Sequence, residues 1–161
     1  MTHSSGHLAL VGPTASGKSA IALALAHELG DVEIVSIDSM QVYRGLDIGT
    51  AKPSLRERAA VAHHLIDVAD PSENWSVAVF QPAARAAIAE IEARGKRALL
   101  VGGTGLYVQA VIDPLVFPPQ NLAVRAEIEA SVQDPVALAA AYAELEALDP
   151  AAAERIEPAN V

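Results

Sequence analysis

The 161-residue chain is 52% hydrophobic and 19% charged, a composition typical of a folded globular protein and unlike that of a disordered one. It has no cysteine, no apolar run long enough to cross a membrane and no basic-then-apolar leader, which favours a cytoplasmic protein over disulfide-stabilised, membrane-spanning or secreted ones. Its net charge of −9 argues against a generic nucleic-acid binder, because phosphate contacts require Lys and Arg.

Short apolar runs alternate with longer helical patterns along most of the chain. Strands are predicted at residues 8–11, 33–37, 63–68 and 97–101. Helices are predicted at residues 18–29, 54–61, 76–94 and 106–112. This alternation is typical of an α/β domain with a parallel sheet flanked by helices. Such sheets bind ligands at the carboxyl ends of their strands, so the segments that follow the strands are expected to form one site.

The segment after the first strand fits the phosphate-binding pattern G-x-x-x-x-G-K-[ST] at every fixed position; it reads Gly12-Pro13-Thr14-Ala15-Ser16-Gly17-Lys18-Ser19. In such a loop, backbone N–H groups and the positive end of the next helix hold phosphates. Lys18 is predicted to bind the outer phosphates, and the Ser19 hydroxyl to ligate Mg²⁺. The motif indicates a P-loop NTPase-like fold. Taken alone it is typical of an ATP site, although another nucleotide or a non-nucleotide diphosphate also fits it.

A polar, glycine-punctuated segment at residues 38–53 follows the second strand. Asp38, its first residue, is expected to point into the same crevice as the phosphate loop. Three roles are open for Asp38: a helix N-cap, a carboxylate that anchors Mg²⁺, or a carboxylate that acts as a general base or orients the substrate. The position at a strand end favours the two site roles. Four nearby cations offer a local basic strip for nucleic acid but are expected to form a solvated loop and helix face: Arg44, Lys52, Arg56 and Arg58.

A second polar, glycine-containing segment, Gly102-Gly103-Thr104-Gly105, directly follows the fourth strand. The glycines permit a close approach of backbones at that point. Thr104 either caps the next helix or offers its hydroxyl to a phosphate or to Mg²⁺. Its place beside the crevice leaves both roles open.

Prolines after residue 113 interrupt the α/β pattern, and three Ala- and Glu-rich helices are predicted beyond them, at residues 122–133, 135–148 and 150–156. We therefore expect two parts: an α/β core at residues 1–113 that lacks its final strand, and a helical insertion that begins near residue 114 and occupies residues 114–161. Arg125 and Arg155 are the only cations after residue 101, so most of the excess acid lies there. The chain is expected to be part of a larger protein.

Five motifs occur in one consistent order: the phosphate loop, Asp38-Ser39-x-Gln41-Val42-Tyr43, Asp47-Ile48-Gly49-Thr50-Ala51-Lys52-Pro53, His64-Leu65-Ile66-Asp67, and Val101-Gly102-Gly103-Thr104-Gly105-Leu106-Tyr107. Together they closely resemble the tRNA dimethylallyltransferases, which are also called tRNA isopentenyltransferases. The set is far more specific than the phosphate loop alone. Members of that family continue well past this length, and the missing part would carry further basic residues.

The resemblance implies transfer of a dimethylallyl group from dimethylallyl diphosphate to N6 of adenosine 37, beside the anticodon of a tRNA. It implies that Asp38 is the general base and that Thr104 contacts the diphosphate or its Mg²⁺. The residues implied to cradle the diphosphate are Gly12, Thr14, Ala15, Ser16, Gly17, Lys18 and Ser19, with Ser19 also on the metal. Those implied to contact the tRNA are Asp38, Ser39, Met40, Gln41 and Arg125. A monomer that binds tRNA and no membrane is expected.

Other activities remain open at this point. An adenylate isopentenyltransferase has a similar loop and aspartate but prenylates free AMP, and the helical segment after residue 113 favours tRNA over AMP as the acceptor. A small-molecule kinase would bind ATP at the loop and use Asp38 to orient a hydroxyl, but it would need an Arg-rich lid, and the sequence offers no clear one. A non-catalytic nucleotide-binding module is the third alternative.

Overall fold

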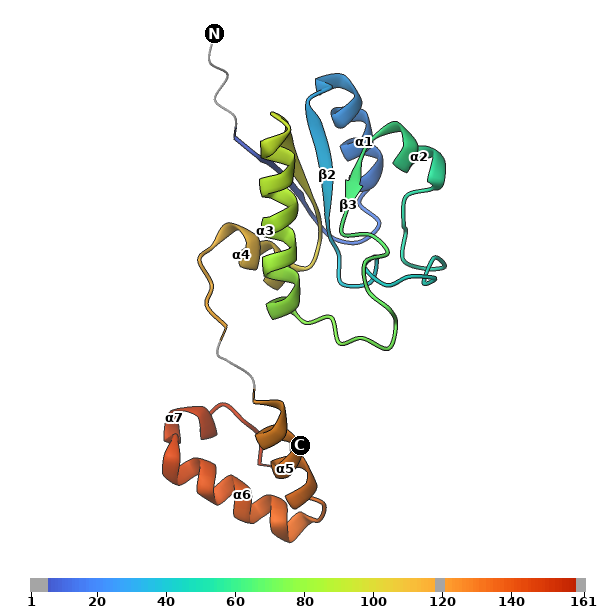
Figure 1. Cartoon of the computed structure of the whole chain (residues 1–161). Helices are drawn as coiled ribbons and strands as arrows, with labels where there is room; N and C mark the ends of the chain where they lie inside the picture. The colour runs from blue at the N-terminus through green and yellow to red at the C-terminus, as the bar shows by residue number, and fades with distance from the viewer. Residues whose placement is uncertain (1–5, 118–120, 159–161) are drawn as a thin grey trace. The chain divides into compact units, whose positions relative to one another are not determined.

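The computed structural model describes residues 6–117 and 121–158, and the chain divides into two compact units (Figure 1). The first unit comprises residues 1–117 and the second residues 118–161. The first unit thus extends slightly beyond residue 113, where the core was predicted to end. Within the described parts of the chain, no helix is long and apolar enough to span a membrane.

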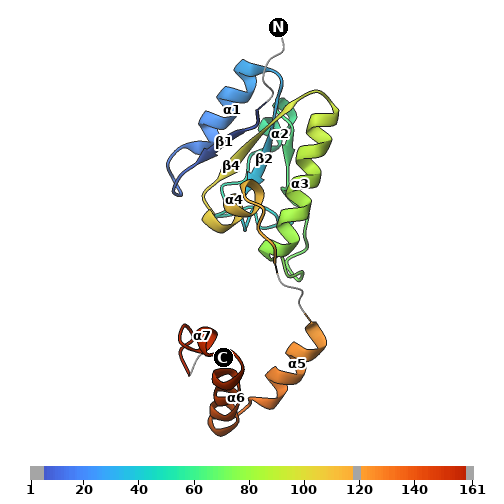
Figure 2. The same ribbon diagram turned by 90° about the vertical axis from the view of Figure 1, so that its left-hand side faces the viewer.

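Four parallel strands form the sheet of the first unit in the order β1-β4-β2-β3 (Figures 1 and 2). They are β1 (Leu8–Val11), β2 (Val32–Ile37), β3 (His63–His64) and β4 (Arg97–Gly102). The central strand β4 pairs with β1 and with β2 along their whole lengths, whereas β3 adds only two residues beside β2. The predicted α/β fold with a parallel sheet is confirmed.

The third predicted strand, at residues 63–68, is wrong beyond His64. Leu65 and Asp67 have φ angles of 62° and 56°, a left-handed conformation that a strand does not contain. The chain turns away from the sheet there, and the Asp67 amide donates to the Gln41 carbonyl at 3.1 Å. The apolar side chains of this segment suggested a strand, but the segment packs along residues 41–44 instead, next to the end of β2.

Helices cover both faces of this sheet (Figure 2). The helices of the first unit are α1 (Lys18–Leu29), α2 (Leu55–Ala60), α3 (Val77–Ala93) and α4 (Gly105–Ile112). Successive strand residues point to opposite faces. Ile34 accordingly packs in the cluster that contains α1 residues, whereas Val35 packs in the cluster that contains α3 residues. Because both faces are covered, all six residues of β2 are buried.

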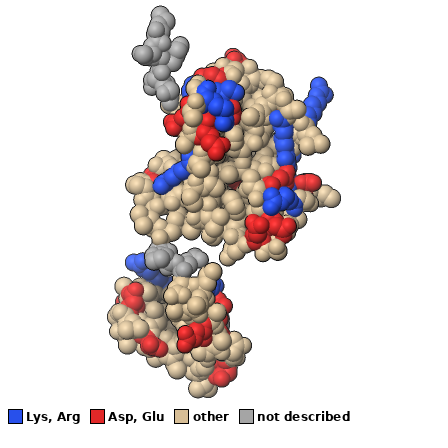
Figure 3. Space-filling view, in the orientation of Figure 1, with Lys and Arg blue, Asp and Glu red and all other residues tan. Residues whose placement is uncertain are grey.

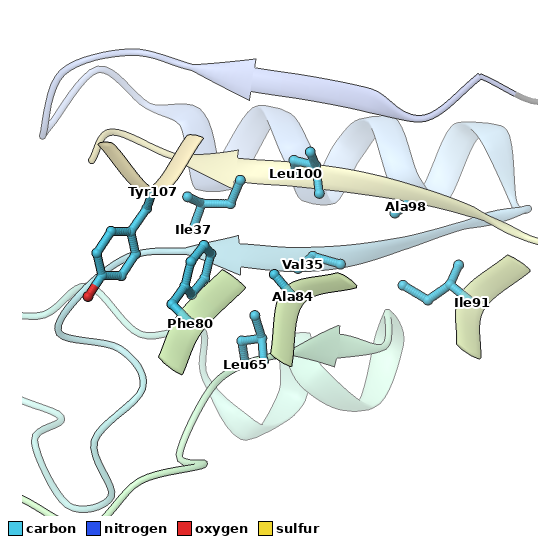
Figure 4. Close-up of a cluster of buried hydrophobic side chains, with 9 residues drawn as sticks. All are labelled: Val35, Ile37, Leu65, Phe80, Ala84, Ile91, Ala98, Leu100 and Tyr107. Atoms are coloured by element: carbon cyan, nitrogen blue, oxygen red, sulfur yellow. The ribbon is translucent and has the colours of Figure 1, made fainter. Parts of the chain in front are cut away.

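The larger of the two hydrophobic clusters lies between the sheet and helices α3 and α4 (Figure 4). Phe80 from α3 is fully buried and stacks on Tyr107 from α4, with 4.4 Å between the ring centroids and 24° between the planes. The Tyr107 hydroxyl donates to the Trp75 carbonyl at 3.0 Å. Such aromatic pairs add about 1 kcal/mol beyond the burial of their area. This contact fixes α4, and therefore Thr104 at its start, against the core.

One buried carboxylate, Glu33 of β2, holds together elements from three parts of the chain. His64 Nε2 lies 2.7 Å and Arg94 Nη2 2.7 Å from Glu33 Oε2, and Lys96 Nζ lies 3.0 Å from Oε1. Burial alone would raise the pKa of Glu33, but hydrogen bonds from Arg94, His64 and Lys96 outweigh it and lower the pKa from 4.5 to about 2. The cluster ties β3 and the loop before β4 to β2.

The lowered pKa of Glu33 predicts a loss of stability in acid. A carboxyl whose pKa is lower in the folded than in the unfolded chain contributes stability above its unfolded pKa and loses it as pH falls. Between pH 4.5 and pH 2 the free energy of unfolding of the wild type should therefore fall on the order of 2 kcal/mol more than that of Glu33→Gln. This figure is smaller than the full pKa shift implies, because solvent partly screens the charges of Arg94 and Lys96. Urea titrations at several pH values measure this difference. Parallel pH dependences for the two proteins would contradict it.

The second unit consists of three helices, α5 (Leu122–Ser131), α6 (Pro135–Leu148) and α7 (Pro150–Ala153). Each begins at a side-chain cap, from Asn121, Asp134 and Asp149 respectively, as expected for these residue types. The prediction for α6 is confirmed, but α5 and α7 end earlier than predicted. Among the described residues of this unit, Ala153 is the only buried one, and large apolar side chains such as Leu122, Val136 and Leu148 are exposed.

Candidate functional site

The phosphate-binding segment forms a tight loop between β1 and α1. Gly17 has a φ of 81° and Ala15 a φ of 63°, so the loop contains two left-handed positions. The amide of Gly12 donates to the carbonyl of Gly102 at 3.3 Å, which joins the start of the loop to the end of β4. Such a loop presents backbone N–H groups to an anion at the N-terminus of α1. The structure therefore supplies the strand–loop–helix context that the motif requires.

Lys18 begins α1, and its ammonium reaches back over the loop. The Nζ atom donates to the Pro13 carbonyl and to the Ser16 hydroxyl, the latter at 3.4 Å. Both acceptors belong to the loop, so the charge is held where the phosphates of a ligand would lie. Ser19 follows in the first turn of α1, and its side chain is exposed beside the loop.

The end of β4 approaches both β2 and the phosphate loop so closely that only glycine fits. A Cβ atom at Gly102 would lie 2.0 Å from the Ile37 carbonyl oxygen, and one at Gly103 would lie 2.6 Å from the Gly12 carbonyl oxygen. Thr104, the next residue, stands at the N-cap position of α4. Within the described residues its hydroxyl makes no capping hydrogen bond, so the capping role is not the one that its side chain fills.

Gly102→Ala is expected to destabilise the first unit by about 3 kcal/mol, because the added methyl group meets backbone of the neighbouring strand β2 at the carboxyl end of β4. Gly105→Ala is the matched control, since a Cβ there meets nothing within 4 Å and the residue lies at the start of a helix. Urea denaturation followed by circular dichroism should show a large loss for the first variant only. Equal stability of both variants would refute the close approach.

Asp38 directly follows β2 and closes a turn. Its Oδ1 atom accepts hydrogen bonds from the backbone amides of Met40 at 2.8 Å and Gln41 at 3.2 Å. The next helix, α2, begins only at Leu55, so the N-cap interpretation of Asp38 is wrong. Across the described residues no group donates to Oδ2 of Asp38, so this oxygen can accept a proton or a hydrogen bond from a ligand.

The side chain of Gln41 is used within the protein. Its Oε1 atom accepts from the Ser36 hydroxyl at 2.8 Å, and its Nε2 atom donates to the carbonyls of Thr50 and Ala51 at 3.1 Å each. Both amide hydrogens are thereby engaged. The structure gives Gln41 a bracing role between β2 and the segment at residues 50–51, and its contact with adenine stays a prediction.

These segments surround one cavity of about 710 Å³ at the carboxyl ends of β1, β2 and β4. The predicted site residues that line it are Thr14, Ala15, Ser16, Gly17, Lys18, Ser19, Asp38, Ser39, Met40, Gln41 and Thr104. Gly12 lies behind this lining, at the start of the loop. Arg125 belongs to the second unit, on α5, where its guanidinium pairs with Glu129 at 2.7 Å.

Part of the cavity wall is apolar, and sequence reasoning did not identify it. Leu23, Ile34 and Ile66 line it together with His63. The Nδ1 atom of His63 donates to the Val61 carbonyl at 2.7 Å, and burial lowers the pKa of its imidazole. The cavity thus combines a phosphate-binding loop with room for an apolar or aromatic group.

Lys52 is buried, which corrects the expectation of a solvated basic strip. Its side chain is 3% exposed, and its ammonium lies 2.9 Å from Asp47 Oδ1 and 2.7 Å from Asp67 Oδ1. Burial would lower the pKa of Lys52, but its hydrogen bonds to Asp67 and Asp47 raise it. Arg58 Nη1 pairs with Asp67 Oδ2 at 2.6 Å. Nothing local in the sequence signals these pairs, because Asp67 lies far along the chain.

Charges of both signs are mixed on one face of the molecule. On the face shown in Figure 3, Lys and Arg side chains lie next to Asp and Glu side chains.

Among the described residues, no three His, Asp or Glu side chains are grouped so that they could hold a metal ion by themselves. A magnesium ion at the phosphate loop would therefore depend on few protein ligands together with phosphate oxygens, which is the usual arrangement for Mg²⁺.

Comparisons with known proteins place this geometry in a family. The sequence pattern of IPP transferase matches residues 41–161, and that of isopentenyl transferase matches residues 6–69. A tRNA dimethylallyltransferase from Corynebacterium glutamicum (strain R) is 54% identical over 150 residues, which cover 93% of this chain and 49% of the relative. A tRNA dimethylallyltransferase from Roseiflexus castenholzii is 56% identical over 158 residues, which cover 96% of this chain and 50% of the relative. The chain spans about half the length of the curated relatives it matches.

Solved structures agree. A tRNA isopentenylpyrophosphate transferase from Bacillus halodurans aligns with a TM-score of 0.66 and 48% identity over 97% of this chain and 52% of its own. A eukaryotic dimethylallyltransferase acting on tRNA aligns with a TM-score of 0.77 and 31% identity, over 94% of this chain and 38% of its own. The match to the family pattern over most of the chain confirms the resemblance read from the motifs. The chain belongs to the IPP transferase family.

Proposed function

We propose that this chain carries the reaction centre of a tRNA dimethylallyltransferase. In the proposed reaction, the dimethylallyl group of dimethylallyl diphosphate is transferred to N6 of adenosine 37 of a tRNA. The observation that carries the proposal is the shared cavity, in which the Asp38 carboxylate and the phosphate loop lie together. A phosphate loop without such a carboxylate would serve a binding protein equally well.

The proposed step is a direct displacement. The C–O bond between the dimethylallyl group and the diphosphate breaks as the C–N bond to N6 forms, and the N6 proton passes to Asp38. The free Oδ2 atom of Asp38 is available to accept that proton. The loop amides and Lys18 stabilise the negative charge that develops on the departing diphosphate, which is typically the largest catalytic contribution in such sites. Thr104 offers its hydroxyl to the same group.

Magnesium fits this arrangement. The hydroxyls of Ser19 and Thr104 both line the cavity and are the neutral oxygen ligands that Mg²⁺ accepts beside phosphate oxygens. When bound, the ion would neutralise charge on the diphosphate leaving group. The residues of the protein hold the diphosphate in the phosphate loop and keep the adenine of the acceptor against Asp38.

The acceptor base must enter the cavity from outside the base stack. Extruding a nucleotide costs a few kcal/mol and is easiest in a loop, which favours an anticodon loop as the substrate. The apolar wall formed by Leu23, Ile34 and Ile66 can receive the flat faces of a base or the dimethylallyl group. We expect the protein to act as a monomer in the cytoplasm, where tRNA is modified.

The test is an acceptor comparison with labelled dimethylallyl diphosphate and Mg²⁺. This chain is incubated with an anticodon stem-loop RNA that carries A37, with the same RNA carrying G37, and with AMP. Label in the A37 RNA alone supports the proposal. Preferential labelling of AMP would instead identify an adenylate isopentenyltransferase. Turnover of ATP without transfer of dimethylallyl to any acceptor would identify a kinase.

A further inference from the structure

The segment at residues 41–53 forms a wall of the cavity; the fully buried Val42 anchors its start in the core, but the part after Val42 is poorly anchored by apolar packing. Gly49, Thr50 and Ala51 line the cavity, yet Leu46 is 37% exposed and Ile48 is 99% exposed. A stretch with so little buried apolar surface keeps one conformation only if polar contacts hold it. Those contacts converge on Lys52.

The Lys52 ammonium uses all three of its hydrogens. It donates to the Tyr43 carbonyl at 2.6 Å, to Asp47 Oδ1 at 2.9 Å and to Asp67 Oδ1 at 2.7 Å. A lysine has three donors and no acceptor, so this buried group is fully satisfied. It joins the beginning and the end of the wall to the segment after β3.

Asp67, the partner of Lys52, is itself held on every side. Its amide donates to the Gln41 carbonyl at 3.1 Å, its carbonyl accepts from Arg44 Nη1 at 3.1 Å, and its Oδ2 accepts from Arg58 at 2.6 Å. Both Asp67 and Ala51 have left-handed φ angles, of 56° and 51°. Non-glycine residues hold such conformations only where the surrounding contacts enforce them.

Stability alone is a poor reason to bury the Lys52 ammonium, whose carboxylate partners Asp67 and Asp47 stay 30% and 69% exposed. The desolvation of buried charges offsets most of their attraction, whereas such networks can fix one conformation among several. The fixed conformation is coupled to Asp38 through one residue. The Gln41 amide donates to Asp38 Oδ1, and the Gln41 side chain donates to the carbonyls of Thr50 and Ala51, directly before Lys52.

We propose that Lys52 is a positioning residue for the acceptor side of the cavity. Its ammonium holds the wall at residues 49–53, and through Gln41 it fixes the turn that presents Asp38 to the amine of the acceptor base. The inference rests on the proposed function for the identity of the acceptor. The brace itself rests on the contacts of Lys52, Asp67 and Gln41 alone.

Lys52→Met tests the brace with two independent measurements. Hydrogen–deuterium exchange of the Met40 and Gln41 amides, which bind Asp38, should become faster in the variant. The kcat for transfer to the A37 stem-loop RNA should fall about tenfold, because small misplacements of reacting groups slow catalysis by such factors. The affinity for inorganic pyrophosphate should stay close to that of the wild type, since the three hydrogen bonds of the Lys52 ammonium go to Tyr43, Asp47 and Asp67, which lie outside the phosphate loop.

Lys96→Met is the matched control, because it also removes a lysine from a buried carboxylate, Glu33, but at the other end of the sheet. It should lower stability and leave kcat and the exchange of Met40 and Gln41 unchanged. If Lys52→Met does not fold, Asp47→Ala removes only one of the three contacts, from a carboxylate that is 69% exposed, and should produce smaller changes in the same direction.

Two results would overturn the brace. One is unchanged exchange at Met40 and Gln41 in a folded Lys52→Met protein. The other is a loss of pyrophosphate affinity in parallel with kcat, which would indicate a general disturbance of the site. The exchange measurement needs no turnover, so it decides the brace even if the wild type transfers no dimethylallyl group and the proposed function fails.

Discussion

Asp38→Asn should lower the rate of dimethylallyl transfer about 100- to 10,000-fold, the range that general-base assistance typically contributes. The amine of adenine is a weak nucleophile, and an amide side chain cannot take its proton. Asparagine keeps an oxygen at the position of Oδ1, so the hydrogen bonds from the Met40 and Gln41 amides can persist. Single-turnover transfer of labelled dimethylallyl to the A37 stem-loop RNA measures the effect.

The expected signature of Asp38→Asn is a slow protein with a normal fold. Pyrophosphate affinity and the free energy of unfolding should stay near those of the wild type. Asp70→Asn is the matched control, because Asp70 Oδ1 makes the same kind of turn contact, with the Ser72 amide at 3.0 Å, outside the cavity. A wild-type rate for Asp38→Asn would remove this residue from the mechanism and leave a binding module as the better description.

Lys18→Met should weaken the binding of inorganic pyrophosphate roughly 10- to 100-fold. A hydrogen bond to a charged group contributes about 1.5–3 kcal/mol, and about 1.4 kcal/mol corresponds to a factor of ten. Lys18 supplies the one cationic side chain among the residues 12–19, and its ammonium lies over the loop between Pro13 and Ser16. Isothermal titration calorimetry at low ionic strength measures the affinity, because salt screens exposed charges.

The comparison protein for Lys18→Met is again Lys96→Met, which changes the net charge equally and lies away from the cavity. Equal pyrophosphate affinities for the two variants would mean that the loop binds through its backbone and the helix terminus alone. Lys18→Arg is not expected to restore full affinity, because a planar guanidinium does not reproduce the compact charge of an ammonium.

Local patterns were sufficient for most of the elements. The limits of β1, α1 and α6 are confirmed, because apolar periodicity, glycine and cap residues mark their ends. β3 departed furthest from its predicted range. Its apolar continuation resembles a strand, but contacts with residues 41–44 force Leu65 and Asp67 into left-handed conformations. Propensity gave way there to tertiary contacts.

The sequence by itself determined which segments meet at one cavity. The phosphate loop, Asp38 and Thr104 each follow a strand, and parallel topology brings the ends of strands to one edge of a sheet. Only the tertiary structure decided how these groups are held. Lys52 meets Asp67, Gln41 meets Thr50, and Glu33 meets Arg94, all across separate segments. The partner of a charged or amide side chain depends on which groups share its low-dielectric surroundings, and no local pattern encodes that proximity.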